Sequence, residues 1–394
     1  MSELPQRREG GPVAALRRDP WRAFFPLGVL LGWAGVANWL LWALGVSHRY
    51  NAVFHATTQV QGSLTAIALG FLLTFVPRRT GTPPPSAGTL AAGLLAPVAV
   101  TVLAWDHWAA AQVVWAACVA AVAAFVARRA LGARGAERLP PVFVWVPVAL
   151  VAGIGGAIAV AVAAARGPAD EPELWLLGRG LVLQGLVTAL VVGVGGTMLP
   201  TLTRGEPPGP TPARGRRRLA QVAAALVFLA SFPVEVYASP RLGLALRAVS
   251  AGAVLVAVAR LWRPPTAPGL HRRLIWIAGW LLPAGYAAAA AFPGQRTAAL
   301  HVTFIGSFAL LALSVALHVT LSHGGHPAAL AGRPWQVRAM ALLLAAATAF
   351  RLLLALDPAR SRAWLALAAA SFVLATLAWS ALAAPALGAG PAPE

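Results

Sequence analysis

Residues 54–85 read FHATTQVQGSLTAIALGFLLTFVPRRTGTPPP. This stretch carries His55 near its start, continues through about twenty mostly apolar residues, and ends at Pro77, Arg78 and Arg79. A helix of twenty residues is roughly 30 Å long, which is the thickness of the hydrocarbon core of a bilayer. The stretch therefore predicts a transmembrane helix with His55 at one membrane face and the arginine pair at the other.

The rest of the chain has the same apolar character. Of its 394 residues, 59% are hydrophobic and 11% are charged, against about 45–50% and 25% in a soluble domain. The pattern predicts an all-α, polytopic membrane helix bundle of about 12 transmembrane helices. The candidate spans are roughly 23–45, 55–77, 86–105, 108–127, 141–165, 174–199, 218–238, 241–262, 274–293, 299–321, 335–355 and 363–384.

The connections between these spans are short, so we expect one transmembrane domain over residues 23–386. Residues 1–22 are predicted to be a cytoplasmic N-terminal segment, and residues 387–394 a short disordered tail. The first apolar run is too long for the core of a secretory signal and lacks a cleavage motif, which favours a retained first span. The single cysteine, Cys118, excludes an internal disulfide and any cysteine-based metal cluster.

Arginine placement predicts the orientation of the bundle. Twenty-two arginines fall in segments on one side of the predicted spans and six on the other. Positive residues are typical of cytoplasmic loops, so both termini are predicted to be cytoplasmic. The net charge of +19 is explained by these loops, and we expect no nucleic-acid partner because no basic, aromatic-studded surface accompanies it.

Three spans end in similar segments. FVPRRTGTPP follows the second span, MLPTLTRGEPPGP the sixth, and VTLSHGGHP the tenth. A spacing of roughly 120 residues would correspond to three quasi-repeats of four helices. The alternative is that proline and glycine simply end helices.

Most ionisable groups within the predicted spans fall in the outer half of the membrane, where each is a functional candidate. His55 and His301 open the second and tenth spans, and Arg179 and Arg351 lie in the outer parts of the sixth and eleventh. Neutral imidazoles are axial ligands of haem iron, and guanidinium groups pair with carboxylates. This layer predicts a haem with His55 and His301 as ligands and Arg351 and Arg179 as partners of its propionates.

Two helix faces are expected to enclose the macrocycle. Below His55 the helical spacing gives Gln59, Gly62 and Ala66, and below His301 it gives three apolar residues. The latter are Ile305, Phe308 and Ala312.

Each of these groups also has an ordinary structural explanation. A histidine at a helix end is often an interfacial residue, and Arg179 and Arg351 could extend to the interface. Glu235 and Arg247 could form a structural ion pair between neighbouring spans. The other histidines in or near spans, His271, His318, His323 and His326, are predicted to lie at the opposite face, too far from His55 to share one metal.

Three passages resemble the NnrS family, bacterial membrane proteins associated with haem and copper and linked to nitric oxide and nitrosative stress. They are residues 54–81, GGTMLPTLTRG at 195–205, and LHVTFIGSFALLALSVALHVTLSHGG at 300–325, which carries over His301 and His323. Where the family has a second His and a Glu, this chain has Thr57 and Thr58. The resemblance implies haem b and a bacterial inner-membrane location, while this departure counts against copper.

A fainter resemblance links the chain to the catalytic subunit of haem-copper oxidases, which also has twelve helices in three quasi-repeats. There the second and tenth helices supply the axial histidines of a haem, matching His55 and His301, and Arg351 is the nearest match to the basic residues at the propionates. The copper histidines of helices six and seven have no counterpart, since those spans offer only Gln184 and Glu235. The resemblance implies a six-coordinate, low-spin haem site.

The expected function is therefore that of an integral membrane haem protein of NnrS type, involved in nitric oxide handling or in associated electron transfer. Its expected partners are the lipid bilayer and either nitric oxide or a redox partner. No nucleophile–base pair is apparent, which leaves open whether it is an enzyme. The alternatives are a twelve-helix secondary transporter without cofactor and a scaffold protein. A transporter site is expected at the membrane midplane rather than in the outer layer.

Overall fold

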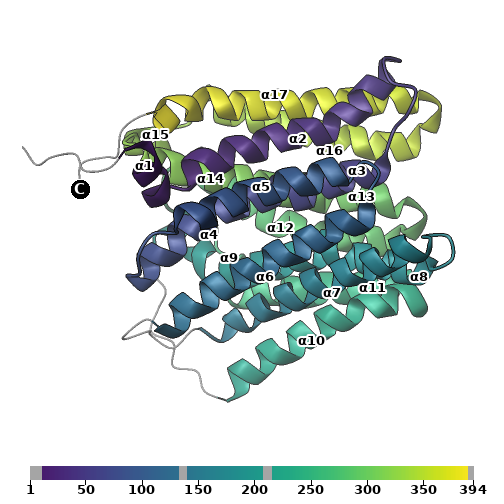
Figure 1. Cartoon of the computed structure of the whole chain (residues 1–394), viewed down its shortest axis with the longest axis horizontal. Coiled ribbons are helices and arrows are strands. Elements are labelled where there is room, and N and C mark those ends of the chain that lie inside the picture. The colour runs from purple at the N-terminus through teal and green to yellow at the C-terminus, as the bar shows by residue number, and fades with distance from the viewer. Residues whose placement is uncertain (1–10, 133–139, 207–214, 389–394) are drawn as a thin grey trace, which may run out of the picture.

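The computed structural model describes residues 11–132, 140–206 and 215–388. Within these ranges the chain is helical and contains no strand (Figure 1). This confirms the predicted all-α membrane bundle. The predicted N-terminal segment contains a short helix, α1 (Pro12–Arg18), and the last helix continues to Gly388, so most of the predicted tail lies outside the described residues.

Eleven helical stretches in the described ranges are long and apolar enough to cross a membrane. Eight of them are α2 (Trp21–Ala43), α6 (Trp108–Gly132), α7 (Trp145–Arg166), α10 (Arg216–Tyr237), α11 (Pro240–Ala257), α12 (Leu270–Ala291), α16 (Trp335–Leu356) and α17 (Ser361–Gly388). The one remaining predicted span, 86–105, corresponds to α5 (Ala87–Leu103), which has 17 residues. That length is at the lower limit of about 17–25 residues for a transmembrane helix.

The other three stretches each contain a π-helical segment. They are α3 (Ala52–Thr57), η1 (Thr58–Leu64) and α4 (Thr65–Thr80); α8 (Pro172–Gly180), η3 (Leu181–Gly185) and α9 (Leu186–Arg204); and α13 (Arg296–His301), η5 (Val302–Ala309) and α14 (Leu310–His323). They have the largest buried shares of all the spans, 67, 56 and 61%. They therefore form the centre of the bundle.

The three π-helical segments support the predicted repeat. They begin at residues 58, 181 and 302, a spacing of about 120 residues that matches the period expected for helices two, six and ten. Two of these helices end alike, because Gly81 (φ 63°) and Gly205 (φ 70°) adopt the left-handed conformation that terminates α4 and α9.

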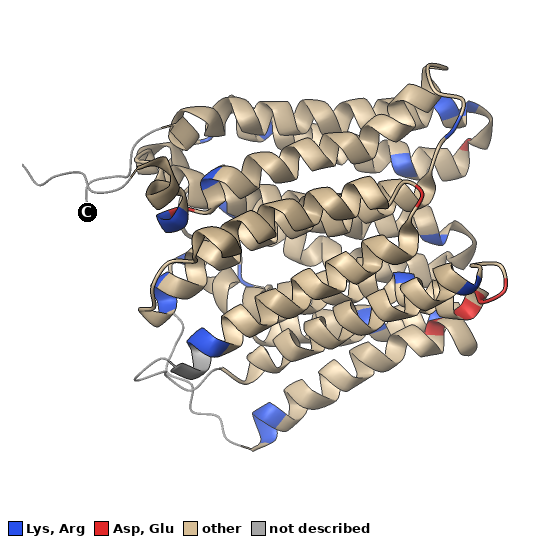
Figure 2. Ribbon diagram, viewed as in Figure 1, with Lys and Arg blue, Asp and Glu red and all other residues tan. Residues whose placement is uncertain are grey.

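The two ends of the bundle differ. α1 and the C-terminal end of α17 lie at one end, called here the terminal end, and the other is the distal end (Figure 1). Most acidic residues visible in Figure 2 lie at the distal end, whereas arginines occur at both. The spans confirm a multi-pass membrane protein, while the membrane side that each end faces stays a prediction.

Candidate functional site

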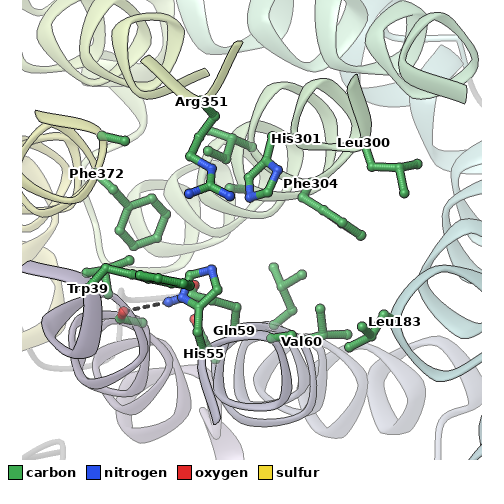
Figure 3. Close-up of a pocket in the computed structure, with 18 of the residues that line it drawn as sticks. Trp39, His55, Gln59, Val60, Leu183, Leu300, His301, Phe304, Arg351 and Phe372 are labelled. Carbon is green, nitrogen blue, oxygen red and sulfur yellow. Dashed lines mark hydrogen bonds between the residues drawn. The ribbon is translucent and has the colours of Figure 1, made fainter. Parts of the chain in front are cut away.

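A cavity of about 280 Å³ lies among six spans in the distal half of the bundle. Its walls come from α2, α16 and α17 and from the three helices that contain π-helical segments. It brings together the two predicted ligands, His55 and His301, the two predicted propionate partners, Arg351 and Arg179, and Gln59. Figure 3 shows His55 and His301 on opposite walls, with both rings directed toward the space between them.

The position of His55 is fixed by the start of its helix. The Asn51 side chain caps α3 by accepting a hydrogen bond from the backbone N–H of Phe54, and Asn38 of α2 bonds the backbone of Asn51 in both directions. His55 Nδ1 lies 3.0 Å from the carbonyl oxygen of Gly35. Because a carbonyl oxygen only accepts, Nδ1 carries the hydrogen, and the lone pair of the neutral ring lies on Nε2.

His301, the last residue of α13, is held in the same way. Its Nδ1 donates to the carbonyl oxygen of Thr297, 2.7 Å away, one turn earlier. Its Nε2 is therefore also a free base. A backbone hydrogen bond that fixes the tautomer is the usual second contact of a metal-binding histidine. The arrangement can therefore hold one metal centre between two imidazoles.

Arg351 and Arg179 bring two positive charges to the cavity wall, both close enough to His55 for electrostatic interaction. Neither forms an ion pair with an acidic side chain in the described ranges. Each guanidinium instead lies near a tryptophan ring, Trp39 for Arg351 and Trp175 for Arg179. The Nε of Arg351 is buried and has no hydrogen-bond partner. Partly buried arginines without an acidic partner favour an anionic ligand.

The predicted face below His55 is only partly correct. Gln59 lines the cavity and donates to the carbonyl oxygen of Gly32, but Gly62 does not line it. A Cβ atom at Gly62 would lie 2.7 Å from Thr101 Oγ1 on α5, away from the cavity. Ala66 is buried and also lies away from the cavity wall.

The π-helical turn explains this difference. It is wider than an α-helical turn, so the cavity face follows His55, Gln59, Ser63 and Ile67 instead of the spacing of a regular helix. The opposite wall contains a second π-helical segment, η5, which likewise changes which residues face the cavity. There Ile305 and Ala312 line the cavity but Phe308 does not.

One charged cavity residue, Arg296, was not predicted as a site residue, because it lies before the predicted start of the tenth span at residue 299. It begins α13, lines the cavity, and forms an ion pair with Glu235. Glu235 in turn binds Arg247 at 2.7 Å, which confirms the ion pair considered from the sequence. Its spacing gives no signal, because Arg296 precedes His301 by five residues and only residues three or four apart share a helix face.

The remaining histidines lie elsewhere. His271 Nε2 and His318 Nδ1 are 3.2 Å apart on α12 and α14, and neither residue lines the cavity. His323 ends α14 and interacts electrostatically with Arg78 and Asp19. Within the described ranges, no group of three or more His, Cys, Asp or Glu residues is placed to hold a metal ion. A copper site built from such a cluster therefore has no candidate there.

A model of the NnrS family, described as NnrS protein, matches residues 15–389 of the chain, nearly its full length. The chain belongs to the NnrS family. No match was found among curated proteins, and none among solved structures. The resemblance to NnrS proteins seen in three passages of the sequence thus covers nearly the whole chain.

The residues of this NnrS-family cavity fit a haem. Two facing imidazoles with free Nε2 atoms match its axial positions, and two uncompensated arginines match the charge of its propionates. Its walls are mostly apolar, and its volume is close to the lower end of the roughly 300–1,000 Å³ typical of small-molecule sites.

Proposed function

We propose that this NnrS-family protein binds a b-type haem between His55 and His301, with Arg351 and Arg179 holding the propionates. We further propose that it serves nitric oxide handling, or associated electron transfer, in the bacterial inner membrane. The observation that supports the proposal most is the matched pair of imidazoles, each with Nδ1 bonded to a backbone carbonyl and Nε2 directed to a shared cavity.

When bound, haem supplies one-electron redox chemistry and affinity for nitric oxide. The chain supplies the ligands and their orientation. The carbonyl oxygens of Gly35 and Thr297 hold the two imidazoles in one tautomer and increase the basicity of Nε2. With His55 and His301 both holding the iron, the group would serve electron transfer more readily than direct gas binding, for which one imidazole would have to move away.

The two arginines at the cavity wall favour a cofactor that carries two negative charges. Arg351 and Arg179 are partly buried at the cavity wall and have no acidic partner in the described part of the chain, so two carboxylates would neutralise them. The proposal assigns no copper site, since Thr57 and Thr58 replace two potential ligands.

Haem content and the reduced and oxidised absorption spectra of the detergent-purified protein test this proposal. We expect a stoichiometric haem with sharp low-spin bands on reduction. His55→Ala or His301→Ala should weaken these bands or convert the haem to a high-spin form. His318→Ala is the matched control, because it removes another partly buried histidine of the tenth span that does not line the cavity.

A colourless wild type from haem-replete cells would overturn the proposal. The alternative of a secondary transporter predicts that result, so the same experiment separates the two functions. Equal bands in the wild type and in both histidine variants would show that haem binds elsewhere.

A further inference from the structure

One carboxylate lies among the arginines around the cavity. Glu235 is on α10, and its side chain is 8% exposed. Its Oε1 accepts a hydrogen bond from Arg296 Nε, and its Oε2 accepts one from an Arg247 amino group at 2.7 Å. Glu235 is therefore shared between an arginine on the cavity wall and an arginine that is completely buried.

The buried arginine fixes this network. Arg247 also donates to Gln184 Oε1 at 2.7 Å and to Ser231 Oγ at 3.2 Å, and its guanidinium lies over the Phe232 ring at 3.7 Å. Gln184 lines the cavity, as Arg296 does. The network thus reaches the cavity at two points, one on η3 and one on α13.

Close packing of two helices holds the carboxylate in place. A Cβ atom at Gly243 of α11 would lie 2.5 Å from the backbone nitrogen of Glu235. The backbones of α10 and α11 are therefore in direct contact at this point, and the Glu235 carboxylate has little freedom to move. The ion pair with Glu235 in turn fixes Arg296, which starts the short helix that ends in His301.

The charges near the cavity are unequal. Arg179, Arg296 and Arg351 line the cavity and Arg247 lies behind its wall, whereas Glu235 is the one acidic residue among the described residues that line the cavity or form an ion pair with its lining. In a low-dielectric interior a single charge acts over a longer distance than in water. Glu235 therefore determines how much positive potential the cavity carries.

We propose that Glu235, acting through Arg296, is a positioning residue that lowers the reduction potential of the iron held between His55 and His301. This inference rests on the proposed haem site. A negative charge near the cofactor disfavours the added electron, and a positive charge favours it. The two members of the ion pair should therefore have opposite effects on the potential.

Potentiometric titration of the purified holoprotein tests the inference. We expect Glu235→Gln to raise the midpoint potential and Arg296→Gln to lower it. In the double variant the two charge changes cancel, so its potential should return close to that of the wild type. A structural role alone would reduce haem content without shifts of opposite sign.

The matched control is Glu206→Gln. Glu206 is also paired with arginines, but it follows α9, at the end of the sixth span that is remote from the cavity residue Arg179. This variant should leave the midpoint potential unchanged. Glu235→Gln leaves Arg247 buried without its counter-charge, which threatens folding. Arg296→Gln tests the inference without that risk, because it leaves the ion pair between Glu235 and Arg247 intact.

The outcomes are distinguishable. A wild type without haem overturns the proposed function and this inference with it. A wild type with a bis-histidine haem whose potential is the same in Arg296→Gln, or shifts upward, overturns the inference and leaves the proposed function in place.

Discussion

His55 and His301 come from helices separated by 246 positions in the sequence numbering, yet they are held alike. Each imidazole donates from Nδ1 to a backbone carbonyl oxygen. Because this acceptor belongs to the main chain, substituting the side chain of the accepting residue does not remove it. The sequence alone predicts the two histidines as ligands, because each opens a span at the same membrane face. It does not predict the tautomers, which depend on where Gly35 and Thr297 place their carbonyl oxygens.

The arginines give the first prediction at this scale. Arg351→Gln and Arg179→Gln should each weaken haem binding by about 10–100-fold, because each removes a charge-assisted hydrogen bond of roughly 1.5–3 kcal/mol to a propionate. Haem titration of the apoprotein measures the affinity. Arg241→Gln, on the exposed start of α11, is the control and should not change it. Equal affinities in all three variants would exclude the arginines from the site.

Glu206 gives a pH prediction. Burial raises the pKa of its carboxyl, but Arg204, Arg263 and Arg260 outweigh this effect and hold the pKa below its ordinary value. A carboxyl with a lowered pKa stabilises the folded protein above its ordinary pKa of about 4.3, and this contribution is lost as the pH falls through the folded-state value.

Thermal unfolding of the wild type and of Glu206→Gln between pH 7 and pH 3 checks this sign. The wild type should be the more stable protein at pH 7, and the difference should shrink as the pH falls below about 4.3. A difference that grows on acidification would contradict the assigned direction.

At the scale of helices, the positions of the membrane spans could be predicted well, whereas the residues on each helix that face the cavity could be predicted less well. Length and hydropathy locate twelve apolar stretches, although α5 and α11 are shorter than the spans predicted for them. The assignment of Gly62 to the cavity failed because a regular helix was assumed, whereas η1 is a π-helix. Arg296 was missed because hydropathy placed the start of the tenth span after it.

The contact between α12 and η5 gives a prediction at this scale. A Cβ atom at Gly285 would lie 2.7 Å from the backbone nitrogen of Thr303, two residues after His301. Gly285→Ala should therefore separate η5 from α12, destabilise the protein by about 1–3 kcal/mol and lower haem retention. Thermal unfolding and haem content measure the two effects.

Gly294→Ala is the control for this substitution. Gly294 precedes His301 by seven positions in the numbering, and a Cβ atom there would meet no atom within 4 Å. It should behave like the wild type. A Gly285→Ala protein that keeps full stability and haem content would contradict the role assigned to the contact.

At the scale of the whole molecule, the described helices form one bundle, and its three central spans contain the π-helical segments. With α5 included the number of spans is even, which places α1 and the end of α17 at the same end of the bundle, as Figure 1 shows. Orientation is predicted from arginine placement alone, since the fold is the same whichever end faces the cytoplasm.

Cysteine labelling tests the orientation. In a Cys118→Ser background, Ala169→Cys places a thiol in the exposed loop before α8, and Arg333→Cys places one in the exposed segment before α16. A membrane-impermeant maleimide should label the first in intact spheroplasts and the second only after permeabilisation. The reverse pattern would place the haem site at the cytoplasmic side.

The central claim is that one iron lies between His55 and His301. Low-temperature electron paramagnetic resonance of the oxidised, purified wild-type protein tests it most directly, because the signal reports the spin state and the axial ligands. The account predicts a low-spin ferric signal of bis-imidazole type that is lost in both His55→Ala and His301→Ala. A high-spin signal in the wild type, or no haem signal in protein from haem-replete cells, would contradict it.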